Sequence, residues 1–207
     1  MYRIPACLAL ATVLTACGGG GGIAGSGSTP LPDPTPSAGP LKKYEGAWIA
    51  PCEVHSRETT SMVSANNGNT LQLNLKSEFY ANVGCTGAII ATATYSGPVI
   101  TLNFTNTVKN ASVKLASGET VTADVDVGGT VAAGQTAILT GTGVTSRIVN
   151  GKMVWTFAFS EGPAEAQFEP ITGTGTGALL LRNGELWTLN TSGTSGTTFN
   201  LENRLTR

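Results

Sequence analysis

The chain of 207 residues carries 12 Lys and Arg against 13 Asp and Glu, a formal net charge of −1, which excludes the polybasic surface that nucleic-acid binding requires. Charged residues make up only 12% of the chain, whereas disordered and helical proteins usually carry more charge. With 27 glycines and abundant Thr and Val, the composition is typical of a β protein long enough for one domain with tails.

The first predicted element is a secretory signal peptide. Arg3 is followed by an apolar run over 4–14, which is too short to span a bilayer as a permanent helix. The end of this run, LTAC at 14–17, resembles the lipobox of bacterial lipoproteins. The resemblance implies that residues 1–16 are removed and that Cys17 receives a diacylglyceryl group and an N-linked acyl chain such as palmitate. Because Gly18 stands where Asp would retain a lipoprotein in the inner membrane, the outer membrane of the cell envelope is favoured.

A linker is predicted between this anchor and the folded domain. The segment 18–28 is rich in Gly and Ser and favours a flexible coil, while 30–40 is rich in Pro and favours extended polyproline II. Two or more acyl chains hold a protein on a membrane stably, so residues 17–40 are expected to form a lipid-anchored, disordered tether. One all-β domain is then expected over 41–207.

Within that domain, short apolar runs alternate with turn signals. Asn-Gly, which favours the two-residue turn of a β-hairpin, occurs at 67–68, 150–151 and 183–184. Apolar and polar residues alternate with a period of two, as in the stretch 100–105. Ten to twelve strands of six to ten residues are expected, with one short helix around 163–168. The predicted fold is an antiparallel up-and-down barrel or, alternatively, a β-sandwich.

Two of the four cysteines, Cys52 and Cys85, lie in the predicted domain, because Cys7 leaves with the signal peptide and Cys17 is the lipidation residue. Two thiols that reach an oxidising export compartment normally pair. A metal site would need more donors than His55, the only histidine of the chain, can add. We therefore predict a Cys52–Cys85 disulfide and neither a metal nor another cofactor.

The start of the domain carries two resemblances. The string YEGAW at 44–48, followed by Cys52, is similar to the start of small bacterial lipoproteins with little assigned activity. Gly46-x-Trp48, together with Arg204 near the C-terminus, resembles the pattern of lipocalin-like (calycin) β-barrels. This second resemblance implies that the Trp48 ring closes one end of the barrel and that Arg204 packs across it. The alternative for Trp48 is an ordinary core position.

No catalytic arrangement is recognisable in the sequence. A Ser-His-Asp triad needs a histidine base, and His55 lies in the segment 53–57, which is expected to expose Glu53, His55 and Arg57 on one solvated strand face. Asp124 and Asp126 have the spacing that opens a calcium loop, but they fall in a strand pattern and are expected on a solvated face. We therefore expect a protein that is not an enzyme.

Two functions are compatible with this organisation. In the first, a lipid-anchored barrel binds a small or apolar ligand in its interior, lined by aromatic residues whose alternative role is ordinary core packing: Phe104, Trp155, Phe157 and Trp187. In the second, the tether presents an adhesin-like or envelope-structural domain to a protein partner at the surface or in the periplasm. The membrane is a partner in both cases, through the lipid anchor.

Overall fold

The computed structural model describes residues 38–191 and 196–207. The predicted signal peptide, the lipidation residue Cys17 and the tether up to residue 37 lie outside the described residues. Within them nearly every segment is strand, and the two helical elements are the single-turn 3-10 helices η1 (Lys42–Tyr44) and η2 (Asn66–Gly68). The prediction of an all-β domain is confirmed.

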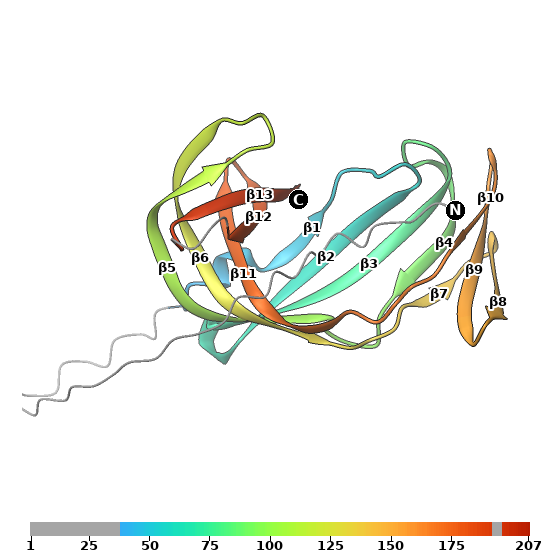
Figure 1. Ribbon diagram of the computed structural model, residues 1–207, viewed down its shortest axis with the longest axis horizontal. Helices are drawn as coiled ribbons and strands as arrows, with labels where there is room; N and C mark the ends of the chain where they lie inside the picture. The colour runs from blue at the N-terminus through green and yellow to red at the C-terminus, as the bar shows by residue number, and fades with distance from the viewer. Residues whose placement is uncertain (1–37, 192–195) are drawn as a thin grey trace, which may run out of the picture.

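The described residues form thirteen strands of 3 to 15 residues, so the strands are more numerous and more uneven in length than expected. In chain order they are β1 (Gly46–Ile49), β2 (Ser56–Ala65), β3 (Thr70–Asn82), β4 (Thr86–Thr94), β5 (Ile100–Lys114), β6 (Thr120–Ala133), β7 (Ile138–Thr140), β8 (Val144–Val149), β9 (Lys152–Phe159), β10 (Gly162–Ala166), β11 (Thr172–Arg182), β12 (Glu185–Thr191) and β13 (Thr198–Leu205). Figure 1 shows them spread along the long axis of the molecule.

The larger sheet closes on itself, which confirms the predicted barrel. Strands β1, β2, β3, β5, β6, β11, β12 and β13 pair in that order, each antiparallel to the next. Ile49 of β1 and Thr206, just after β13, exchange two backbone hydrogen bonds of 2.7 and 2.9 Å and join the two ends of this series. The up-and-down order is interrupted twice, by β4 and by the segment from β7 to β10.

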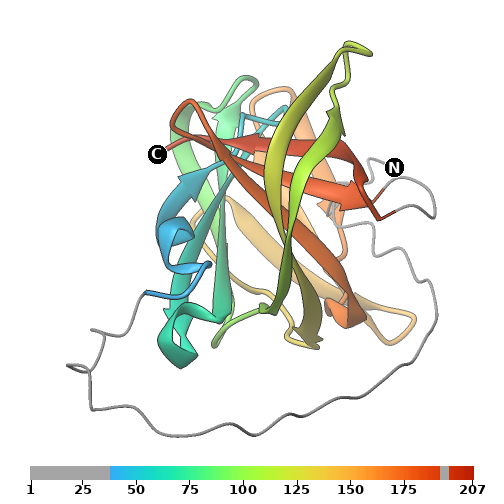
Figure 2. The same cartoon turned by 90° about the vertical axis from the view of Figure 1, so that its left-hand side faces the viewer.

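A second, smaller ring of five strands was not foreseen from the sequence. The beginning of β13 pairs in parallel with the end of β5, Thr198–Asn200 beside Ser112–Lys114, and so closes β5, β6, β11, β12 and β13 into a mixed barrel. This pairing is possible because β5 is 15 residues long and is bent by two register shifts against β6. Figure 2 shows the long β5–β6 hairpin arching over the last three strands.

The three Asn-Gly hairpins are confirmed as turns between β2 and β3, β8 and β9, and β11 and β12. Asn67, Asn150 and Asn183 all have positive φ, between 51° and 54°, and each is followed by a glycine that also has positive φ. This is the backbone conformation that a tight hairpin turn requires, and Asn and Gly adopt it at low cost.

The prediction of a short helix around 163–168 is wrong, because residues 162–166 form strand β10 instead. β10 pairs with β9, which pairs with β8, in a separate three-stranded sheet. Pro163, which disfavours a central strand, is tolerated here because β10 is an edge strand and needs no second backbone partner. The pairing of Ala164 with Phe157 and of Ala166 with Trp155 fixes the strand register.

Apolar side chains gather in three clusters along the molecule. The first core lies between β1–β3 and β11–β13, the second between the three-stranded sheet and β3, β4 and β7, and the third inside the five-stranded ring. The β11–β12 hairpin is buried on both faces, since Leu179 and Leu186 belong to the first core while Leu180 and Trp187 belong to the third.

Strand β6 is also covered on both faces near Asp126. The expectation that Asp124 and Asp126 share a solvated face is therefore wrong. Asp124 is exposed and lies 2.7 Å from the Lys109 ammonium, but Asp126 is 1% exposed. The third core covers one face of β6 at this point, and Tyr44 of η1 covers the other face. The Asp126 carboxylate accepts hydrogen bonds from the Tyr44 hydroxyl (2.7 Å) and from Thr107 (2.6 Å).

The buried Tyr44 hydroxyl should make the folded protein less stable at alkaline pH. Its burial and, second, the Asp126 carboxylate raise its pKa far above the ordinary 10.0, so above pH 10 the folded state holds a proton that the unfolded state releases. The free energy of unfolding should therefore fall by about 1.4 kcal/mol per pH unit above pH 10 because of Tyr44 alone. Urea titrations at several pH values between 9 and 11 give the free energy of unfolding as a function of pH. This free energy should fall less steeply with pH in Tyr44→Phe than in the parent protein. Equal slopes in both proteins would contradict this assignment.

Candidate functional site

The Cys52–Cys85 disulfide is present, as predicted. It joins the segment between β1 and β2 to the residue just before β4, across 33 positions of sequence. The two short connections that it links lie at the same end of the sheet. This end of the sheet is therefore cross-linked covalently.

The predicted pairing of Trp48 with Arg204 is wrong, although Trp48 is buried in the first core. Arg207 is the residue whose guanidinium lies over the Trp48 ring, 4.5 Å from the centroid, while Arg204 lies 4.6 Å from the centroid of Trp187. Arg204 is the direct cross-strand partner of Trp187 and lies on the face of the third core, opposite to the face on which Leu205 packs in the first core with Trp48. The bridge from Thr206 to β1 brings Arg207 to Trp48 instead.

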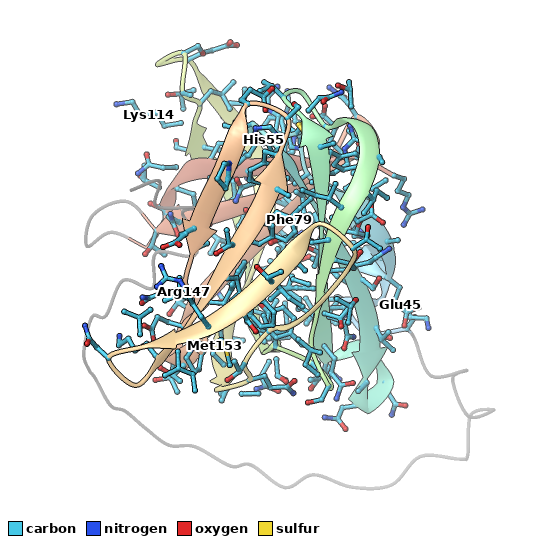
Figure 3. The ribbon with its side chains drawn as sticks, turned by 90° about the vertical axis from the view of Figure 1, so that its right-hand side faces the viewer. Glu45, His55, Phe79, Lys114, Arg147 and Met153 are labelled. Atoms are coloured by element: carbon cyan, nitrogen blue, oxygen red, sulfur yellow. A yellow bond between two sulfur atoms is a disulfide. The ribbon has the colours of Figure 1, made fainter. Side chains whose placement is uncertain are left out.

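The four aromatic residues expected to line one ligand site are not brought together. Phe104 packs at the edge of the first core, Trp155 and Phe157 belong to the second, and Trp187 belongs to the third. The reason is that β9 belongs to the separate three-stranded sheet, which no sequence pattern distinguished from the barrel. Figure 3 looks onto this sheet, which lies in front of Phe79; the Phe79 and Phe157 ring centroids are 4.6 Å apart.

The solvated face expected for residues 53–57 is also not formed. His55 precedes β2, its ring stacks on Phe159 at 4.0 Å, and its Nε2 lies 3.4 Å from the Glu161 carboxylate. Arg57 instead lies on β2, opposite Glu78 of β3. These contacts of His55 join the three-stranded sheet to the disulfide end of the barrel.

The strand register identifies an open part of the barrel interior. On β2, Glu58, Thr60 and Met62 point to the same side, and Thr60 and Met62 are buried whereas Glu58 is exposed. On β3, Leu71 is fully buried and its inward-facing successors Leu73 and Leu75 are only half-buried. The interior is thus sealed at the first core and, on the inner face of β3, closed again at Phe79 of the second core, so the accessible positions lie between the two.

Strand β11 shows the same gradient from the other wall. Gly177 faces inward, because a Cβ there would lie 3.0 Å from Cδ1 of Leu102 in the first core. Two and four residues earlier, on the same face, Gly175 is half-buried and Gly173 is exposed. Because glycines have no side chain, this wall contributes no side chain to the interior at this level. We call the region lined by Glu58, Leu73, Leu75, Tyr95, Gly173 and Gly175 the open interior.

Glu58 and Tyr95 are the titratable groups of the open interior. Register places Glu58 opposite Ser77, and Ser77 opposite Ala93, two residues before Tyr95. Burial and, second, the Glu53 carboxylate raise the pKa of Glu58 above 4.5. Burial and, second, the charge of Glu58 raise the pKa of Tyr95. Glu58 is reached by water and yet desolvated by the surrounding chain, as expected of a group that points into a concave opening.

The side chains that could act as metal ligands restrict what the site can bind. Among residues 38–191 and 196–207 no three His, Cys, Asp or Glu side chains are grouped so that they could hold a metal ion. The described part of the chain also contains no helix long and apolar enough to cross a membrane. The open interior offers a carboxylate, a phenol and apolar walls, which can orient a small molecule by one charged contact and bury its apolar part.

The comparisons with known proteins give no relatives. No family model, no curated protein and no solved structure matches this chain. The function is therefore inferred from the chemistry of the site itself.

Sequence analysis missed both titratable residues of the open interior. For Glu58 a signal was present, because the alternation Glu58-x-Thr60-x-Met62 puts a carboxylate on the strand face that carries the apolar residue. Tyr95 lies just outside β4, and no local pattern connects it with β2.

Proposed function

We propose that this protein is a lipid-anchored protein of the bacterial cell envelope whose barrel binds a small, largely apolar ligand without catalysis. The observation that carries the proposal is the burial gradient along β2, β3 and β11, which leaves inward-facing positions accessible between the first and second cores. The lipobox resemblance at Cys17 supports the anchor and the envelope location, with the outer membrane favoured. The accessible positions support interior binding.

The experiment is native mass spectrometry of the mature protein purified from membranes in mild detergent. We expect a mass excess, beyond the lipid anchor, that disappears on denaturation. Leu75→Trp, which fills the open interior, should lower the occupancy at least about fivefold. Val63→Trp is the matched control, because Val63 is 52% exposed on the outer side of β2 and should leave the occupancy unchanged. Equal occupancy in both variants would contradict interior binding.

One observation favours the alternative function, an adhesin-like or envelope-structural protein with a protein partner. β8 is an edge strand of the three-stranded sheet, and Ile148 on it is 72% exposed beside its cross-strand partner Met153, which is 46% exposed. Unpaired edge strands with apolar side chains are sites at which other chains add. A mass without any bound ligand would favour this alternative.

A further inference from the structure

Among residues 38–191 and 196–207, no cationic side chain pairs with the carboxylate of the open interior. In the described part of the chain Glu58 forms no ion pair within 4.0 Å; the Thr60 side chain hydrogen-bonds its carboxylate, and the charge that acts on it is the Glu53 carboxylate, of the same sign. On the outer side of the same hairpin the situation is reversed. There Glu78 lies 2.6 Å from the Lys76 ammonium and opposite Arg57. The two carboxylates are on neighbouring strands, but only the outer one has cations beside it.

The surroundings of Glu58 are apolar and aromatic. Leu75 and Leu73 continue along the inner face of β3 toward the first core, and Tyr95 packs against the second core. A cationic group that entered here would meet a carboxylate and the face of a phenol ring, both of which attract positive charge. An alkyl chain attached to it would lie along the two leucines, facing the side-chain-free wall at Gly175.

We propose that the open interior selects amphiphiles with a cationic head group, with the ammonium at Glu58 and Tyr95 and the alkyl chain along Leu73 and Leu75. This inference rests on the function proposed above and specifies the chemical class of its ligand. A carboxylate without an ion-pair partner beside apolar walls attracts an entering cation, whereas a neutral head group gains no ionic contact there and an anionic one is repelled. The raised pKa of Glu58 agrees with such an unpaired site.

The test compares three probes with the same alkyl chain: n-decylamine, n-decanol and decanoate. Isothermal titration calorimetry of the mature protein at pH 7 should give an affinity for the amine about tenfold higher than for the alcohol, and the weakest binding for the carboxylate. Glu58→Gln should reduce the preference for the amine over the alcohol to less than about twofold. Glu78→Gln, which removes the outer carboxylate of the same hairpin, should keep the full preference.

The outcomes separate this inference from the proposed function. Equal affinities for amine and alcohol in the unmodified protein, or a preference that survives Glu58→Gln, would overturn the cationic selectivity while leaving interior binding intact. Failure of all three probes to bind would overturn this inference, whereas the native mass spectrum decides interior binding separately. The comparison of the three probes in the unmodified protein decides the question even if the variant does not fold, which circular dichroism would reveal.

Discussion

The Trp48→Ala variant should lose about 3–5 kcal/mol of the free energy of unfolding, the cost of truncating a large core aromatic. Trp48 is 1% exposed and packs in the first core with residues such as Leu41 and Leu205. Its Nε1 donates a 2.8 Å hydrogen bond to the Tyr44 carbonyl, and Arg207 covers the ring. Truncation would remove the apolar contacts and leave the carbonyl without its donor.

Urea denaturation of the two proteins at neutral pH measures this loss. The matched control is Ile49→Ala on the same strand, where the side chain is 36% exposed and the expected loss is below about 1.5 kcal/mol. If Trp48→Ala cost no more than this control, the ring would not be a central part of the first core.

Removal of the Cys52–Cys85 disulfide should cost roughly 3–4 kcal/mol, the chain-entropy value for a closed loop of this length. The double variant Cys52→Ala/Cys85→Ala should therefore have a much lower urea midpoint than the parent. The same shift should follow when the parent is reduced, and reduction should leave the double variant unchanged. A shift on reduction that persists in the double variant would show that the reductant acts elsewhere.

The parts of this fold that follow from short-range sequence patterns were predictable. The three Asn-Gly turns require positive φ, so their positions follow from the residues themselves. The disulfide followed from the count of exported thiols. The parallel contact between β13 and β5 depends instead on how strongly a 15-residue strand bends, which no local pattern reports.

Burial was the least predictable property, because it depends on what covers the second face of a strand. Asp126 has the local pattern of a solvated residue and is buried only because η1 folds over β6. Arg204 and Arg207 are equivalent as sequence signals, and only the register of β13 decides which of them meets Trp48. The open interior likewise arises between the β2–β3 hairpin and β11, which are far apart in the chain.

The N-terminal segment joins the barrel at one particular end. Gly39 and Leu41 donate backbone hydrogen bonds to Asn67 and Gly68 in the turn after β2, so the described chain enters at the end where the first core seals the interior. Glu58 lies toward the opposite end of the same strand. With the proposed lipid at Cys17, the tether would leave the barrel at this sealed end, away from Glu58. A bound ligand could therefore enter and leave without passing the segment that anchors the protein.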